Sequence, residues 1–313
     1  MRLSRLITDY LAYRRALGNR FASEGFVLQA FCRHLGDAQL GEIAADGERT
    51  FLFNGKTTPS TVARKRRVLA GLYRYAHVRV GAKLPPLPAS PAGPPSSFVP
   101  YIYSHEELRR LLDAAPAICD VRLALVEGYA LRTLLLLLYG AGLRLGEALR
   151  LNDADVDVHQ AVLTIRQTKF FKTRLVPIGA DLAQVLTEYR RQRDQHRAVR
   201  SDAPFPCLRN GARMNAPVVE RTFRRLRAAA GVQREGGPRH QPRLHDLRHA
   251  AAVHRLLRWY RSGADVQRLL PQLATYLGHK DLSGTQRYLT LTPQLLRAAG
   301  RRFERYAWEN RHD

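Results

Sequence analysis

The sequence predicts a mainly α-helical protein with a small β-hairpin, arranged as a helical N-terminal domain followed by a mixed α+β domain. Three observations support this fold class. Apolar residues recur at helical spacing through most of the chain. The stretches "AVLTIRQ" (161–167) and "TRLVPI" (173–178) are typical of two paired strands. The segment 84–100 is dense in Pro, Ser and Gly, which predicts an extended linker between domains at 1–83 and 101–313.

Helices are expected in the first domain at three places. "LSRLITDYLAYRRALG" carries an apolar stripe at helical spacing, formed by Leu3, Leu6, Ile7, Tyr10 and Leu17. "FVLQAFCRHLG" predicts a second helix that ends at Gly36. "PSTVARKRRVLAGLYRYAH" predicts a third, with its start at Pro59 and Ser60. The apolar stripe of this third helix is Val62, Leu69, Leu72, Tyr73 and Ala76.

The second domain combines helices with the hairpin. "SHEELRRLLDAA" (104–115) opens with Ser104 and Glu107 at capping-box spacing. A mostly buried helix is expected over 121–140, before the hairpin. Further helices are expected at 180–198, 216–230, 246–261, 265–276 and 293–308.

The charge of the chain indicates a polyanionic partner. Lys plus Arg number 51 and Asp plus Glu number 27, so the net charge is +24. Such an excess favours nucleic acid or an anionic membrane. The longest apolar run, residues 134–143, is far shorter than the ~20 residues that a membrane span needs. The N-terminus is interrupted by charges, which argues against a signal peptide. We therefore expect double-stranded DNA as the partner, and no membrane.

Cysteine usage fits a reducing compartment. The three cysteines are far apart and form no Cys-x-x-Cys pair. This argues against a disulfide framework or a zinc knuckle. We expect a cytoplasmic protein.

The third predicted helix carries a basic face. It consists of Arg64, Lys65, Arg66, Arg67 and Arg74, of which the first four are the expected DNA contacts. A solvated surface would explain these residues, but the charge of the whole chain favours contact with DNA.

Two further stretches carry candidate anion-binding residues. In "GAGLRLGEALRL" (140–151), a Gly-rich turn precedes Arg144, and Glu147 follows one turn later, where it could simply pair with Arg144. In "RLHDLRHAAAVHRLL" (243–257), His245 and His249 imitate half of a zinc-protease helix. The residue after His245 is Asp246, however, where that motif needs Glu. Arg and His together suit a phosphate better than a metal ion.

A lysine-bearing turn is predicted at the tip of the hairpin, "TKFFKTR" (168–174). Lysine can lose its proton and arginine cannot. Only six of the 51 basic residues are lysines, so a lysine at this tip fits a general acid.

These stretches, together with "LGHKDLSGTQRY" (277–288), resemble the tyrosine recombinase (integrase) family in order and spacing. "GLRLGE" is similar to its first arginine box, "HDLRH" to its His-x-x-Arg box, and "TKFFKTRLVPI" to its hairpin. In the last box of the family, a His precedes the nucleophilic Tyr by nine positions, as His279 precedes Tyr288. The resemblance covers about 104–295, and the upstream helices suit the core-binding domain of the family. The stretch between Arg248 and His279 is longer than in compact relatives, which favours a mobile-element recombinase.

The resemblance implies a catalytic set of six residues: Arg144, Lys169, His245, Arg248, His279 and Tyr288. Tyr288 is expected to attack a DNA phosphate and form a covalent 3′-phosphotyrosine link. The two arginines and His279 would hold the phosphate, His245 would accept the tyrosine proton, and Lys169 would protonate the leaving 5′-oxygen. Glu147 is expected to orient Arg144 or a histidine. Lys172 and Arg174 are expected to contact DNA, and neither a metal nor another cofactor is implied.

Several questions stay open at this point. Two other functions have the same chemistry or fold: a DNA-binding protein that does not cleave, and a type IB topoisomerase-like enzyme. The family implies four protomers in the synapse, on DNA in the bacterial nucleoid, with accessory recombinases as a further possibility. The helix at 293–308 could dock on a neighbouring protomer or on its own domain. The target sequence and the direction of the reaction, whether integration, excision, resolution or transposition, do not follow from the sequence.

Overall fold

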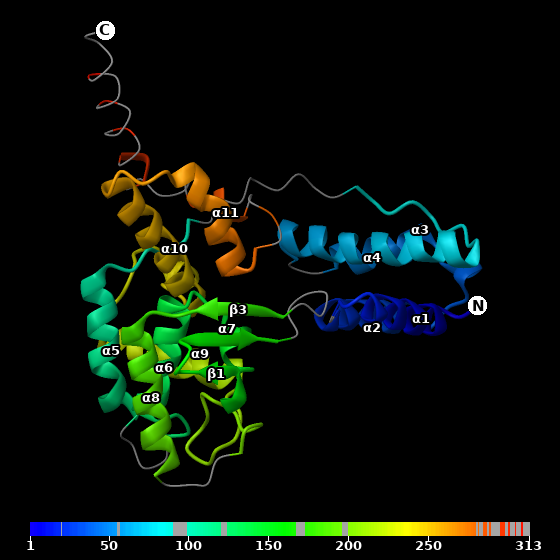
Figure 1. Ribbon diagram of the computed structural model, residues 1–313. Helices are drawn as coiled ribbons and strands as arrows, with labels where there is room; N and C mark the ends of the chain where they lie inside the picture. Colours follow the sequence, from blue (N-terminus) through cyan, green and yellow to red (C-terminus); the bar gives the residue numbers. More distant parts are fainter. Residues whose placement is uncertain are drawn as a thin grey trace. The chain divides into compact units, whose positions relative to one another are not determined.

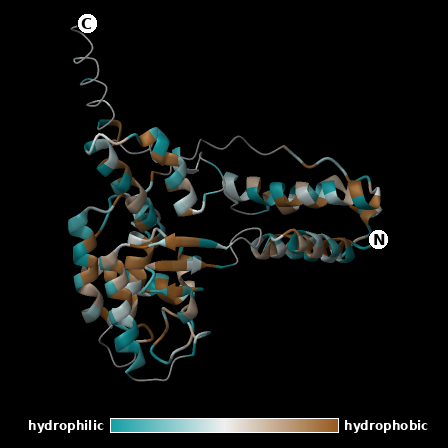
Figure 2. Cartoon of the chain, in the orientation of Figure 1, coloured by the Kyte–Doolittle hydropathy of each residue, from teal (hydrophilic) through white to brown (hydrophobic). Residues whose placement is uncertain are grey.

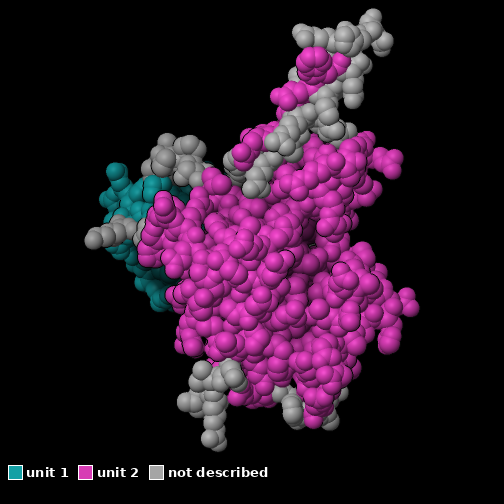
Figure 3. Space-filling view, turned by 90° about the vertical axis from the view of Figure 1, so that its left-hand side faces the viewer, with its two compact units in different colours: residues 1–98, 169–172 teal, residues 99–168, 173–313 magenta. Residues whose placement is uncertain are grey.

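The computed structural model describes residues 1–19, 21–54, 57–89, 99–119, 124–166, 173–195 and 200–279, and then positions 281, 284–286, 288, 295–297, 300, 304 and 308. The described residues form two compact units, one of residues before position 99 and one of residues from Val99 onward (Figures 1 and 3). Part of the predicted linker, 90–98, lies outside the described residues. The domain boundaries at 83 and 101 stay a prediction.

The first unit is helical. Its helices are α1 (Leu3–Ala16), α2 (Ala22–Leu35), α3 (Ala45–Phe53) and α4 (Pro59–Val80), with a short 3₁₀ turn, η1 (Leu40–Glu42). They share one apolar core, which includes Leu6, Leu28, Leu52 and Leu72, each with 0% exposure. In Figure 2, hydrophobic and hydrophilic residues alternate around these helices, as expected for helices that each bury one side.

The three helices predicted in this unit are confirmed, with different ends. The predicted second helix begins earlier, at Ala22, and ends where expected, before Gly36. The third begins at Pro59, after Thr58, whose hydroxyl accepts a hydrogen bond from the Thr61 amide. The placement of Leu17 on the buried stripe of α1 is wrong, because the helix ends at Ala16 and Leu17 is 48% exposed.

Helix α3 was not expected from the sequence. One of its inward positions is Glu48, which is fully buried and accepts a hydrogen bond from the Tyr73 hydroxyl. A carboxylate on the buried side breaks the apolar pattern by which an amphipathic helix is recognised. Phe51 and Leu52 are the other buried side chains of this helix.

The second unit contains helices and a small sheet. The helices are α5 (His105–Cys119), α6 (Gly128–Gly140), α7 (Leu145–Ala148), α8 (Ala180–Asp194), α9 (Ala216–Ala229), α10 (Leu244–Arg261) and α11 (Val266–Leu277), with 3₁₀ turns η2 (Asp153–Asp155) and η4 (Pro238–His240). The strands are β1 (Val156–Asp157), β2 (Val162–Ile165) and β3 (Arg174–Pro177), in the order β1-β2-β3. The predicted mainly α fold with a small sheet is confirmed.

The hairpin is confirmed by the pairing of β2 with β3. The strands are antiparallel, and Ile165 pairs with Arg174 at the end nearest the turn. The turn residues 167–172, which include Lys169 and Lys172, lie outside the described residues. The sheet gains a third strand, β1, which the sequence did not suggest because it is only two residues long.

The first two helices of this unit show one confirmed prediction and one correction. At α5, the Ser104 amide donates to Glu107 and the Glu107 amide donates to Ser104, at 2.7 and 3.1 Å, so the capping box is confirmed. The helix predicted over 121–140 begins only at Gly128, because the Glu127 backbone is extended. A Cβ at Gly128 would meet Pro116 Cα at 2.5 Å, so the close approach of α5 requires glycine there.

Helix α6 lies at the centre of the second unit. It packs against α5, α8 and α10. Its buried leucines, Leu131, Leu134, Leu135, Leu137 and Leu138, are each at most 2% exposed. Hydrophobic residues also fill much of the strands (Figure 2). Among the described helices, none has both the length and the apolar composition to cross a bilayer.

The described positions of the last predicted helix, 295–297, 300, 304 and 308, are helical. Leu295 is 1% exposed and belongs to the apolar cluster of α10 and α11. Leu296 and Trp308 are 56% and 67% exposed. Leu295 therefore packs on its own unit, whereas the described side chains of Leu296 and Trp308 face outward.

Candidate active site

The candidate residues are contributed by separate elements of the second unit. Arg144 directly precedes α7, and Arg174 is the first residue of β3. Arg248 lies in the second turn of α10, and His279 follows the end of α11. The fold brings these segments together around one buried carboxylate, Glu147.

Glu147 binds two arginines directly. It accepts hydrogen bonds from Arg144 Nη1 at 2.7 Å and from the Arg144 amide at 2.9 Å. Arg174 donates Nη1 to one oxygen and Nη2 to the other, both at 2.9 Å. Arg248 Nη1 lies 4.0 Å from the same carboxylate. We call Glu147 with these three arginines the Glu147 cluster.

The position of Glu147 follows from local helix chemistry. It is the third residue of α7, where a Glu side chain can accept the otherwise unpaired amide before the helix. Burial alone would raise the pKa of Glu147, but hydrogen bonds from Arg174 and Arg144 outweigh it and lower the pKa to about 2. Glu147 is therefore ionised at neutral pH. One carboxylate among three arginines leaves a local excess of positive charge, which suits a phosphate.

Arg248 is held by backbone carbonyls. It is 1% exposed, and its Nη1 and Nη2 donate to the carbonyls of Gly142 and Leu277. Gly142 has a φ of +61°, and a Cβ there would meet Leu277 at 2.8 Å, so glycine allows this close approach. Burial and the Arg144 charge lower the pKa of Arg248 to about 10, which still leaves it charged at neutral pH.

Tyr288 is buried between histidine rings. It is 4% exposed, and its ring centroid lies 5.4 Å from His249 and 6.0 Å from His279. The exposed His245 stacks edge-to-face on His249 at 4.7 Å. His279 Nδ1 lies 2.6 Å from the Thr285 hydroxyl, which fixes the imidazole plane.

The protonation of these groups follows from their surroundings. Burial raises the pKa of Tyr288, against the lowering effect of the Arg248 charge and of a hydrogen bond from Arg248. Desolvation and Arg248 lower the pKa of His279 to about 4. Desolvation and His245 lower the pKa of His249 to about 3. Desolvation and Arg248 also lower the pKa of His245. The site thus holds a protonated tyrosine, neutral imidazoles and charged arginines near neutral pH, a set suited to general-base activation of a hydroxyl next to a bound anion.

Comparison with known proteins identifies the family of this chain. Residues 102–294 match the phage integrase family. The chain belongs to the phage integrase family. It is a tyrosine recombinase.

One relative and a solved structure extend the match over nearly the whole chain. The integrase/recombinase y4rE of Sinorhizobium fredii is 36% identical over 308 residues, which cover 96% of this chain and 95% of that protein. The integrase/recombinase y4rB of the same organism is 44% identical over 219 residues, 69% of each chain. The Tn1549 transposon integrase, solved in complex with transposon right end DNA, has a TM-score of 0.65 at 18% identity and covers 98% of this chain and 100% of that chain. At that identity the likeness shows a common fold.

The recombinase brings together the described members of the predicted catalytic set. Arg144 and Arg248 lie beside Glu147, which accepts a hydrogen bond from the Arg144 side chain. His279 lies next to Tyr288, whereas His245 is separated from the tyrosine ring by His249. Lys169 lies outside the described residues, and its role stays a prediction.

Two residues of the site were not assigned these positions from the sequence. Arg174 was expected to contact DNA, yet both of its terminal nitrogens bind Glu147. The sequence motifs assign His249 no catalytic role, yet its ring contacts Tyr288. The available signal for His249 was its place one helical turn after His245, which puts both rings on one side of α10.

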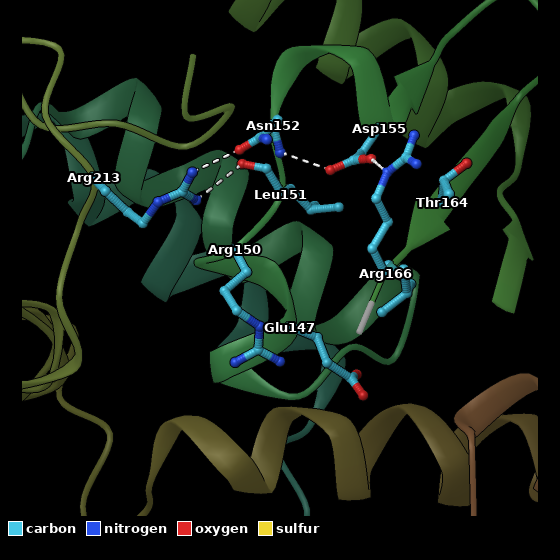
Figure 4. A pocket seen from close by; sticks show the side chains of 9 residues that line it. Glu147, Arg150, Leu151, Asn152, Asp155, Thr164, Arg166 and Arg213 are labelled. Atoms are coloured by element: carbon cyan, nitrogen blue, oxygen red, sulfur yellow. Dashed lines mark hydrogen bonds and ion pairs between the residues drawn. The ribbon is translucent and has the colours of Figure 1, made fainter. Parts of the chain in front are cut away.

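Glu147 also lines a small cavity of about 280 Å³. In Figure 4, Arg166 reaches Asp155 on one side of it, and Arg213 reaches Asn152 and Leu151 on the other. These arginines are paired with groups other than Glu147. Among the described residues, no three His, Cys, Asp or Glu side chains gather as a metal site would require.

The basic residues of α4 in the first unit have weaker partners. Arg64 Nη2 donates to the Ser23 carbonyl at 3.4 Å, and Arg67 is exposed. Lys65 donates to the Phe51 carbonyl at 2.9 Å and lies 4.4 Å from the centre of the Phe51 ring. Arg66 donates to the Pro88 carbonyl at 2.7 Å. Their contact with DNA stays a prediction.

Proposed function

We propose that this recombinase catalyses site-specific DNA recombination through a covalent 3′-phosphotyrosine intermediate. The observation that carries the proposal is the placement of Tyr288 against Arg248 and two neutral imidazoles, beside the Glu147 cluster. Tyr288 Oη attacks a backbone phosphorus, the bond from phosphorus to the 5′-oxygen breaks, and a free 5′-hydroxyl departs. The DNA bound by the transposon integrase of the same fold supports a DNA substrate here.

The arginines stabilise the charge that the phosphate gathers during attack. Arg144 is 40% exposed and can turn donors toward an entering phosphate, while Glu147 keeps its guanidinium in place. Arg248 supplies a buried charge that is already held by carbonyls. Donors fixed before the reaction cost no reorganisation during it. His279 adds a further donor once it is oriented by Thr285.

Two proton transfers accompany the attack. His245 accepts the proton of Tyr288, and the ring of His249, between them, is placed to take part in this transfer. Lys169 donates a proton to the departing 5′-oxygen. Rejoining is the reverse reaction: a 5′-hydroxyl attacks the phosphotyrosine, and the tyrosine regains its proton. No external energy source is needed, because one phosphodiester replaces another.

Exchange between two duplexes requires four strand cleavages, and a synapse of four protomers on two DNA molecules would supply one active site for each. The outward-facing Leu296 and Trp308 are available for a contact between protomers. The long stretch between Arg248 and His279 supports a role in moving a mobile element, on the DNA of the bacterial nucleoid. Accessory recombinases could assist this assembly.

A nicked suicide substrate tests the proposal, because loss of a short 3′-flanking piece traps the adduct. The wild-type chain should form a covalent protein–DNA adduct that resists denaturation. Tyr288→Phe removes one oxygen and should form none, while DNA affinity remains close to wild type. A wild-type chain that binds this DNA without an adduct would instead be a non-cleaving DNA-binding protein. Relaxation of supercoiled DNA by the monomer would favour the topoisomerase-like activity.

The general acid can be tested separately. Sulfur in place of the bridging 5′-oxygen gives a leaving group that barely needs a proton. Lys169→Ala should cleave ordinary DNA very slowly and recover on the sulfur substrate, whereas Tyr288→Phe should not recover. Lys172→Ala is the neighbouring control and should be impaired far less on ordinary DNA. Rescue of Lys172→Ala in place of Lys169→Ala would assign the acid to Lys172.

A further inference from the structure

Arg174 joins the hairpin to α7. It is the first residue of β3, directly after the segment that contains Lys169, and its side chain is only 15% exposed. Its two terminal nitrogens bind the two oxygens of Glu147, each at 2.9 Å. A bidentate pair of this kind fixes the relative orientation of both groups. The start of β3 is therefore attached to the helix turn that follows Arg144.

The same carboxylate connects Arg174 with Arg144. Glu147 accepts the Arg144 side chain at 2.7 Å and the Arg144 amide at 2.9 Å while it binds Arg174. A shift of Arg174 would therefore move the carboxylate that orients Arg144. The two arginines act on one anion and cannot be displaced independently.

Gly278 also contacts the arginines that bind Glu147. It ends α11 with a φ of +66°, and a Cβ there would lie 2.8 Å from Arg174 Nη1 and 2.9 Å from Arg174 Cζ. The guanidinium thus lies directly against this turn, which only glycine leaves open. The Gly278 carbonyl accepts a hydrogen bond from Arg144 Nη2 at 2.8 Å, and His279 is the next residue.

We propose that Arg174 is a positioning residue that joins three parts of the active site: the hairpin that carries Lys169, the turn of Arg144 and Glu147, and the turn before His279. This inference rests on the proposed function, since it assigns Arg174 a role in that reaction instead of contact with DNA. A DNA contact needs exposed donors, and both terminal nitrogens of Arg174 are engaged by Glu147. Lys169 precedes Arg174 by five positions in the sequence, so the chain that carries it enters β3 at the residue that Glu147 binds.

The test compares two substrates for Arg174→Lys, which keeps the charge but loses the planar fork. Cleavage of ordinary suicide DNA should fall by the order of 10- to 100-fold, because a small misplacement of a catalytic group is enough for such a loss. On DNA with sulfur at the bridging 5′-position, most of the loss should disappear. The same preparation meets both substrates, so the ratio of the two rates does not depend on how much of the variant is folded.

Arg166→Lys is the matched control. Arg166 directly follows β2 on the other side of the hairpin, is 60% exposed and pairs with Asp155 instead of Glu147 (Figure 4). It should cleave both substrates at close to the wild-type rate. This control distinguishes the effect of losing the contact with Glu147 from the effect of replacing any arginine of the hairpin.

Three results would overturn the role of Arg174. They are wild-type cleavage by Arg174→Lys, an equal loss on both substrates, or a loss accompanied by equally weakened DNA binding, which would make Arg174 a DNA contact. Wild-type protein and Lys169→Ala are run alongside. Absence of a wild-type adduct would count against the proposed function. Failure of the sulfur substrate to rescue Lys169→Ala would count against Lys169 as the general acid. Both outcomes differ from the three results that would overturn the role of Arg174.

Discussion

Arginines occur in two different settings in this recombinase. On α4, Arg64 and Arg67 are exposed, and Arg64 donates one long hydrogen bond, of 3.4 Å, to the Ser23 carbonyl. In the Glu147 cluster, Arg174 and Arg248 are 15% and 2% exposed at their side chains and have several partners each. The arginines of α4 can contribute charge wherever a polyanion comes close. The arginines of the Glu147 cluster are held in one orientation before any substrate binds.

This difference separates affinity from catalysis. Exposed cations bind a phosphate backbone through counterion release and need no defined geometry. A transition state is stabilised by donors that are already oriented, and orientation requires burial and partners. The buried carboxylate of Glu147 is what allows several arginines to lie close together in this unit. The predictions below test that division, from the largest expected effect to the smallest.

Replacing Arg248 should have the largest effect on the reaction. Arg248→Lys keeps the charge but cannot donate to the carbonyls of Gly142 and Leu277 with one planar fork. We expect cleavage of the suicide substrate to fall by roughly 10²- to 10³-fold, as for the loss of one oriented donor. DNA affinity, measured by gel shift, should change little. A near wild-type cleavage rate would mean that burial and fixation of this arginine are not required.

Glu147→Gln should reveal the electrostatic role of the carboxylate in stability. Burial tends to raise the pKa of Glu147, but Arg174 and Arg144 lower it to about 2, from an ordinary value near 4.5. The ionised group therefore stabilises the folded protein by about 3 kcal/mol above pH 4.5, and this contribution is lost as the pH falls toward 2. Denaturant unfolding should show the variant less stable than wild type at pH 7, with a difference that shrinks below pH 4.5. A difference independent of pH would argue against ionised Glu147 as its source.

The basic face of α4 should give the smallest effect, and only on binding. Replacing Arg64 and Arg67 with Ala should reduce the slope of log affinity against log salt by roughly 1.8, at about 0.9 for each lost phosphate contact. Lys65→Ala should change the slope less, because its ammonium already binds the Phe51 carbonyl. Cleavage at saturating protein should be unaffected. An unchanged slope for the double variant would mean that this face is only solvated.

Much of the fold was predictable because local patterns express it. The stripe of α4, the capping box of Ser104 and Glu107, and the paired strands around the hairpin were each visible in a short window. Predictions failed where a tertiary contact replaced the local rule. Helix α3 was missed because Glu48 places a carboxylate on its buried side, where it accepts a hydrogen bond from Tyr73, a residue of another helix. Helix α6 starts late because Gly128 lies against Pro116 of α5.

The sequence by itself determined the candidate set, since the order and spacing of Arg144, His245, Arg248, His279 and Tyr288 identify them without coordinates. Only the tertiary structure decided how these residues are held. The contacts of Arg174 with Glu147 and Gly278 span 27 and 104 positions of the chain, and no periodic pattern encodes such a pair. The physical reason is that exposure and partners set the role of an arginine, and both are fixed only when distant segments pack together.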